Sequence, residues 1–301
     1  MRRANTFLLA GLLLGAVIAF LVTEAQPYRQ VVTAAAPVDG SGVISATTDS
    51  STPDSSTPDS SPVPKASTGS AAPQQGTDLK TELPALVPQG HVSVVVYDRR
   101  NGTTPVSLDA HRHYTSASLV KLMIAFDALD RGTSPATVRE MLSRSDDDLA
   151  SKLWVAGGET HIVREAVSEM GLAETTPPED PGRWGDTEIT AADITRVYRY
   201  LMDRAPAQQR ETILRALRGA TENGADGFRQ YFGIPDALGD ASWAVKQGWS
   251  CCNPGRILHT SGLVKDDRYL VTVLTENPRS VGYETAEAQV TEVVKHLPGI
   301  R

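Results

Sequence analysis

Cysteine is scarce in this 301-residue chain, and its placement limits what it can do. Cys251 and Cys252 are neighbours, so they cannot form the usual disulfide that closes a loop. In an exported chain a disulfide between neighbours, two free thiols, or metal ligation with His259 stay open, and we favour the first two. A stable zinc site needs about four ligands, so we expect no metal here. Because no cysteine lies near the N-terminus, we also expect no lipid anchor on cysteine.

Basic blocks, histidine clusters and one common hydrolase motif are also missing. Beyond Arg2 and Arg3 there is no run of Lys or Arg, and the formal net charge is −7, which argues against a nucleic-acid partner. The six histidines show no metal-ligand spacing, His111 and His113 being the closest pair, so we expect neither a metal nor a cofactor. The GWSCC stretch at 248–252 is one residue short of G-x-S-x-G and βαβ alternation is absent, which excludes the α/β hydrolases.

The N-terminal segment 1–25 has the pattern of an export signal. Two arginines precede a nearly unbroken apolar run over residues 7–22. The run is slightly shorter than the about 20 residues of a spanning helix, and the small-residue site after it suits cleavage poorly. A cleaved signal peptide and an uncleaved membrane anchor therefore both stay open. Either way we expect a secreted or membrane-anchored protein at the outer face of the cytoplasmic membrane or in the cell wall.

Residues 26–76 form a linker rich in Ser, Thr and Pro, with the repeat DSSTP at 49–53 and 54–58. Such a composition buries too little apolar surface to offset its ordering entropy, so we expect it to be disordered. It would act as a spacer, with or without sugars on its hydroxyls. Residues 77–301 remain as one folded domain, long enough for a single core.

The folded domain reads as α+β. A β-branched run and a second extended piece flank Asn101-Gly102, which predicts a hairpin over residues 92–108. Apolar residues at three- and four-residue spacing then predict an all-helical lobe, within which Thr190 is placed as an N-cap with Asp193 in the capping-box position. Three β-rich pieces and a closing helix follow, so we expect a sheet of about five antiparallel strands with the lobe inserted. The helical stretches are 133–158, 161–172, 190–220 and 284–297, and the late strands are 242–250, 255–264 and 268–277.

Ser118 and Lys121 lie at the head of an apolar helix over residues 114–132. Positions i and i+3 share one helix face, which brings the lysine within reach of the hydroxyl. A lysine acts as a base only when its pKa falls, and the apolar residues around Lys121 would bury it. Ser116 is available as the helix cap, which leaves Ser118 free for chemistry.

Two further elements follow Ser118 and Lys121 along the chain, first SDD at 145–147 and then KQG at 246–248. With Ser118 and Lys121 they make the folded domain resemble the penicillin-recognising serine enzymes, the class A β-lactamases and D,D-peptidases with S-x-x-K, S-D-N and K-T-G elements. The resemblance implies a β-lactamase/transpeptidase-like fold. It also implies acylation of a serine by a β-lactam, a peptidoglycan-type peptide or another small amide or ester.

The resemblance assigns roles to the matching residues. Ser118 would be the acylating nucleophile and Lys121 the acceptor of its proton. Ser145 would relay a proton to the leaving group, and Lys246 would supply positive charge to that relay or to a substrate carboxylate.

The same resemblance implies a substrate-binding edge. Gly248 would let the substrate approach the strand backbone, and Asp147 and Gln247 would be further substrate contacts. The backbone N–H groups of Ser118 and Trp249 would form the oxyanion hole.

The sequence also departs from the family pattern. Asp147 stands where the family has Asn, so an acceptor replaces a donor amide, and Gln247 replaces a hydroxyl residue. The interval from Ser118 to Ser145 is short, and the E-x-x-L-N context of the loop glutamate that activates water is missing. Among the loop carboxylates Glu179 is the candidate for the deacylation acid. We favour an active envelope hydrolase, and the alternative is a weak or inactive relative that serves as a binding module in the cell wall.

Overall fold

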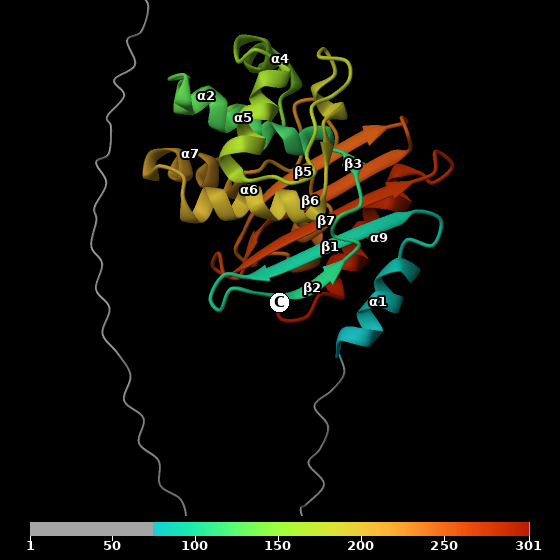
Figure 1. Cartoon of the computed structure of the whole chain (residues 1–301). Coiled ribbons are helices and arrows are strands. Elements are labelled where there is room, and N and C mark those ends of the chain that lie inside the picture. Colours follow the sequence, from blue (N-terminus) through green and yellow to red (C-terminus); the bar gives the residue numbers. More distant parts are fainter. Residues whose placement is uncertain (1–74, 301) are drawn as a thin grey trace, which may run out of the picture. The chain divides into compact units, whose positions relative to one another are not determined.

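The central element is a five-stranded antiparallel sheet that joins the start and the end of the folded domain (Figure 1). The computed structural model describes residues 75–300. The predicted hairpin is confirmed: β1 and β2 pair antiparallel around Asn101-Gly102, where Gly102 has φ +73°. β1 then pairs with β7 from His91↔Glu276 to Asp98↔Tyr269. The order is β2-β1-β7-β6-β5, with β1 His91–Asp98, β2 Thr103–Leu108, β5 Trp243–Cys251, β6 Arg256–Val264 and β7 Tyr269–Asn277.

Each face of the sheet buries its own hydrophobic core, because successive side chains of a strand point to opposite faces. Val94 and Val96 of β1 pack with residues of α1 and α9, whereas Val95 belongs to the core beneath the helical lobe. Figure 1 shows α9 and α1 on one side of the sheet and the lobe on the other. The helices of the first side are α1 Gln75–Ala85, α8 Ile234–Leu238 and α9 Tyr283–Lys295.

The helical lobe confirms the predicted helical stretches and divides two of them. The stretch over residues 133–158 is broken at residues 144–146, where Asp146 caps a new helix by accepting a hydrogen bond from Leu149 N at 2.9 Å. This break forms a corner that faces β5, and it places Ser145 there. The helices are α2 Lys121–Asp130, α3 Pro135–Ser143, α4 Asp147–Ala156, α5 Thr160–Met170, α6 Ala191–Asp203 and α7 Ala207–Arg218.

The cap of α6 is partly as predicted. The Thr190 hydroxyl accepts from Asp193 N at 3.2 Å, so Thr190 is the N-cap. Asp193 does not complete a capping box, which would need a hydrogen bond from the backbone N–H of Thr190. Its carboxylate instead accepts hydrogen bonds from the backbone N–H groups of residues 173–175. Burial alone would raise the pKa of Asp193, but these hydrogen bonds outweigh burial and lower it. Asp193 therefore anchors the loop that leads toward the site.

The predicted signal or anchor segment 1–25 lies outside the described residues. So does the predicted linker 26–76, apart from Gln75 and Gly76, which already belong to α1. Within residues 75–300, no helix has the length and apolar character needed to cross a bilayer.

Candidate active site

The nucleophile candidate Ser118 lies in a tight 3-10 turn, η1 Ala117–Val120, that runs directly into α2. Ala117 has φ +45°, a left-handed conformation that non-glycine residues rarely adopt, and Ser118 is only 5% exposed. Ser116 occupies the N-cap position of η1, as predicted, but its hydroxyl makes no capping hydrogen bond. The single proton of its hydroxyl is shared between the carbonyl oxygens of Ala117 at 3.1 Å and Gly185 at 3.2 Å. The turn is thereby tied to the loop around Gly185.

Lys121 lies where the i, i+3 spacing predicts. Its Nζ is 2.6 Å from Ser118 Oγ and 2.6 Å from Asp147 Oδ1, and its side chain is fully buried. The Trp184 ring covers the ammonium group at 4.3 Å. Burial lowers the pKa of Lys121, while the Asp147 carboxylate offsets part of that effect. Lys121 thus contacts both the candidate nucleophile Ser118 and the carboxylate of Asp147.

Ser145 and Lys246 form a second buried pair. Lys246 Nζ donates to Ser145 Oγ at 2.9 Å and to the Gln247 carbonyl at 2.8 Å. Ser145 has φ +52° at the corner between α3 and α4, which aims its hydroxyl at β5. Burial, and then the charge of Lys121, hold the pKa of Lys246 well below its usual value. The predicted relay residues are therefore in contact.

The KQG element at 246–248 lies on β5, the strand that borders the site. β5 is an edge strand of the sheet and runs beside η1. A Cβ on Gly248 would lie 3.1 Å from Ser116 O, so the close approach here is to the nucleophile turn. The Gln247 amide points away from Ser118 and donates to the carbonyls of Gln230 at 3.0 Å and Phe232 at 2.6 Å. Gln247 therefore holds the 230–232 segment, which differs from the predicted substrate contact.

Trp249 and Asp147 stand at the mouth of the site. Trp249 stacks on Phe228 with ring centroids 5.0 Å apart, and its Nε1 donates to Asp226 at 3.0 Å. The Asp147 side chain is 62% exposed, although one oxygen is held by Lys121. Both residues line a cavity of about 360 Å³ that opens onto Ser118.

Glu179 does not lie in the Ser118 cavity. It is exposed and lines a second cavity of about 480 Å³, which shares Arg183 and Asp186 with the first. Among the described residues, the carboxylates that line the Ser118 cavity are Asp147 and Asp186. Asp147 is paired with Lys121, and Asp186 pairs with Arg183 at 2.5 Å. The structure thus gives no support to Glu179 as the water-activating acid.

The loop over residues 182–186 is the part of the site that sequence reasoning missed. Besides covering Lys121, Trp184 donates from Nε1 to Ser151 Oγ at 3.1 Å, which fixes the loop on α4. Gly185 lies against Ala117, with the nearest atom 3.8 Å from a Cβ built on it. A tryptophan between glycine-rich turns in a polar loop was the available signal, because an indole seldom stays on a solvated loop without a partner.

The cysteine pair and His259 lie near this edge without joining the chemistry. Cys251 and Cys252 form a disulfide between neighbours, one of the two favoured states. His259 is fully buried, with Nε2 2.9 Å from Thr115 O and Nδ1 3.2 Å from Thr275 N. Both ring nitrogens are used by the backbone, so His259 has none left for a metal shared with the cysteines. Burial lowers the pKa of His259 to about 4, which keeps the ring neutral.

The arrangement has the parts that acyl transfer needs. A buried lysine with a lowered pKa lies within hydrogen-bond distance of a serine at the head of a helix. A second serine, Ser145, accepts a hydrogen bond from a second lysine, Lys246, at the corner between α3 and α4. Asp147 is the unusual feature, because a carboxylate on Lys121 favours its protonated form.

No protein-family model matches the chain. Proteins of Mycobacterium tuberculosis and Mycobacterium bovis named "Putative lipoprotein LppW" are 33% identical over 237 residues, covering 74% of this chain and 73% of theirs. A class A β-lactamase from Bacteroides cellulosilyticus superposes with a TM-score of 0.63 at 13% identity, covering 75% of this chain and 97% of that one. PBP-A gives a TM-score of 0.60 at 16% identity, with 73% and 94% covered. The predicted β-lactamase-like fold is confirmed, and the chain belongs to the family of LppW, with the fold of the penicillin-recognising serine enzymes.

Proposed function

We propose that this protein is a cell-envelope serine hydrolase that is acylated on Ser118. The observation that carries the proposal is the 2.6 Å contact between Ser118 Oγ and the fully buried Nζ of Lys121. A buried ammonium group is costly, so burial favours the neutral amine that can accept the serine proton. The substrate would be a β-lactam, a peptidoglycan-type peptide or another small amide or ester.

In the proposed reaction Ser118 Oγ bonds to the substrate carbonyl carbon, and its proton passes to Lys121 Nζ. The negatively charged oxygen of the tetrahedral intermediate would accept hydrogen bonds from the backbone N–H groups of Ser118 and Trp249. The C–N bond of a β-lactam or amide, or the C–O bond of an ester, then breaks. The leaving nitrogen or oxygen takes a proton from Ser145, and the Lys246 ammonium group returns a proton to Ser145. An acyl ester on Ser118 remains.

The comparisons support the substrate class and the location. The fold neighbours include enzymes named β-lactamases, and a variant of PBP-A has been solved as an acyl-enzyme complex with penicillin G. The relative LppW carries the name of a lipoprotein. With the apolar run over residues 7–22, these names support an exported protein at the membrane or in the wall, held by that run if it is not cleaved.

One observation favours a second candidate function, a binding module without turnover. The Asp147 carboxylate lies 2.6 Å from Lys121 Nζ, and an ion pair of this kind holds the lysine as an ammonium that cannot accept a proton. In that case the cavity would bind wall peptides without forming a covalent bond.

Labelling with a fluorescent penicillin tests the proposal. The intact chain should be labelled, Ser118→Ala should not, and Ser168→Ala, which removes an exposed serine of α5, should behave as wild type. Label retained by Ser118→Ala would refute the nucleophile assignment. Failure of the wild type to label, together with reversible binding of wall peptides, would establish the binding module instead.

A further inference from the structure

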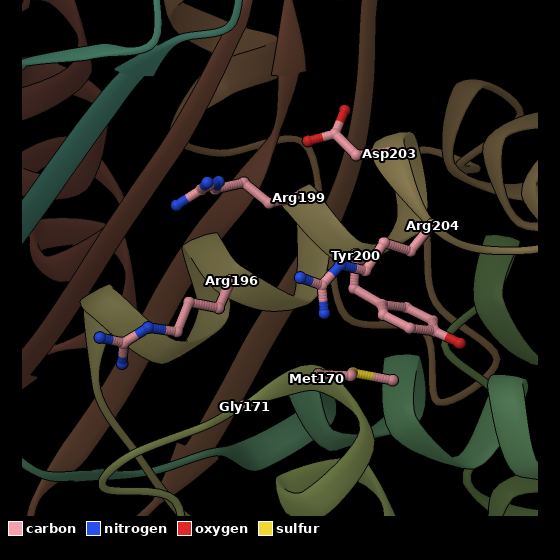
Figure 2. A pocket seen from close by; sticks show the side chains of 7 residues that line it. All are labelled: Met170, Gly171, Arg196, Arg199, Tyr200, Asp203 and Arg204. Atoms are coloured by element: carbon pink, nitrogen blue, oxygen red, sulfur yellow. The ribbon is translucent and has the colours of Figure 1, made fainter. Parts of the chain in front are cut away.

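A basic cavity lies on the lobe apart from the Ser118 site. It has a volume of about 290 Å³, lies along α6 and the end of α5, and shares no lining residue with the Ser118 cavity (Figure 2). Three of its lining residues are arginines of α6 and its C-cap: Arg196, Arg199 and Arg204. Arg196 and Arg199 lie one turn apart on α6, and Arg204 follows at its C-terminal end. In Figure 2 the Arg204 side chain turns back along α6 toward Arg196.

Two of these guanidinium groups have no carboxylate partner among residues 75–300. Arg199 lies over the Tyr97 ring at 4.8 Å and makes no ion pair, and Arg204 makes none either. Arg196 pairs with Asp193. A guanidinium stacked on a ring keeps its in-plane N–H donors free for an oxyanion.

The acidic groups around the cavity are already engaged. Asp193 accepts three backbone N–H groups besides Arg196, and Glu169 accepts the Tyr200 hydroxyl. Asp203 lines the cavity but pairs with Arg99 at 3.3 Å. The Glu169 carboxylate keeps its charge, but the residues that line the cavity include three arginines and one carboxylate, Asp203. Positive charge is therefore in excess in this lining, although the chain as a whole carries a formal net charge of −7.

The helix dipole explains only part of this cluster. Cations are stabilised in the last turn of a helix, which accounts for Arg204 at the C-cap. Arg196 and Arg199 lie one to two turns earlier, where the dipole has little effect. Beside them Tyr200 and Met170 supply an apolar wall, and Gly171, left-handed at φ +67°, has nothing within 4 Å of a Cβ built on it. The cavity is thus concave, basic on one side and apolar on the other.

We propose that this cavity binds a phosphate group, as a phosphomonoester or phosphodiester. A carboxylate has two oxygens and one charge, whereas a phosphate offers more acceptor oxygens and up to two charges to the guanidinium groups that line the cavity. The apolar wall of Tyr200 and Met170 would contact the carbon part of the phosphoester. The site is independent of acylation at Ser118, since the two cavities share no residue.

Titration calorimetry of the full chain tests the proposal. Inorganic phosphate, pyrophosphate and glycerol 3-phosphate are each titrated into the protein, at an ionic strength held constant with NaCl. The double variant Arg199→Gln/Arg204→Gln removes the two unpaired guanidinium groups. The control Arg139→Gln/Arg164→Gln removes the same charge from two other arginines of the lobe, on α3 and α5. A parallel arm measures cosedimentation with vesicles of phosphatidylglycerol in phosphatidylcholine, which distinguishes a lipid headgroup from a soluble phosphate.

We expect saturable binding in at least one arm, with an affinity that weakens about tenfold for each guanidinium group removed. The control variant should bind as wild type, and both variants should keep their labelling at Ser118. Absence of saturable binding in both arms would overturn the proposal. So would binding that the double variant keeps, or a control variant that weakens binding to the same extent as the double variant.

Discussion

Lys121 and Asp147 form an ion pair with Nζ and Oδ1 2.6 Å apart, although the lysine is fully buried and the carboxylate is mostly exposed. Burial lowers the pKa of Lys121 and the carboxylate works against that effect. Asp147 therefore affects the fraction of Lys121 present as the free base, and in the reaction that we propose the acylation of Ser118 depends on that fraction.

Replacing Asp147 by Asn should speed acylation. Without the carboxylate the pKa of Lys121 falls further, so the amine is neutral at a lower pH. Below that pKa the labelling rate should rise about tenfold for each unit by which the pKa falls. The rate should increase with pH in both proteins, and the rise in the variant should come at lower pH. Rates of labelling with a fluorescent penicillin from pH 5 to 9 measure this directly.

Asp148→Asn is the matched control, because Asp148 is the exposed next residue of α4 and does not line the Ser118 cavity. Its pH profile should overlay that of wild type. Loss of labelling in Asp147→Asn would mean that the carboxylate itself takes the proton, against the role given to Lys121.

Ser145 can be tested with two substitutions that separate chemistry from backbone strain. Both Ser145→Ala and Ser145→Gly remove the relay hydroxyl, so both should slow acylation about 100-fold or more. Because Ser145 has φ +52°, glycine should be more stable there than alanine by about 1 kcal/mol in the free energy of unfolding. Labelling rates check the loss of acylation, and urea unfolding checks the difference in the free energy of unfolding. Near-wild-type labelling in either variant would exclude Ser145 from proton transfer.

The acyl group should persist, since both carboxylates that line the Ser118 cavity are paired. We expect one equivalent of adduct and little steady turnover of a chromogenic cephalosporin. Gly185 has room for a side chain beside the nucleophile turn, so Gly185→Glu should introduce turnover and Gly185→Gln should not. Fast turnover by the wild type would show that another group activates water.

His259 should make the fold sensitive to acid. Its pKa is lowered to about 4 from an ordinary 6.5 by burial, so the unfolded chain binds the proton more readily. Stability should thus fall as pH drops from about 6.5 to about 4, by up to about 3 kcal/mol from this residue. Urea unfolding across this range should show a shallower decline in His259→Gln than in wild type or in His161→Gln, an exposed control. Equal slopes would contradict the buried neutral state.

The sequence predicted the five strands of the main sheet, most helices and the Ser118–Lys121 contact because these depend on periodicity and short spacing. Ser118 and Lys121 meet through a helical i, i+3 relation that any helix would produce. The pairing of Ser145 with Lys246 could be expected only from the family resemblance, since it joins residues far apart in the chain.

Long-range loop geometry accounts for what the sequence did not predict. Glu179 and Trp184 lie in the same polar loop; the local pattern indicates that the indole has a partner, but not that this partner is Lys121. Because successive side chains alternate along β5, Gln247 faces the side opposite to Lys246, and only the fold shows that the 230–232 segment lies there. The break between α3 and α4 depends on a left-handed Ser145, a conformation that propensity does not favour.

Intact-mass measurement after incubation with penicillin G, followed by peptide mapping, tests acylation at Ser118 most directly. We expect a mass increase of one penicillin per chain, located on the peptide that contains Ser118 and absent from Ser118→Ala. An unmodified mass at saturating penicillin G and with a generic serine-reactive probe, or an adduct on any other residue, would contradict it.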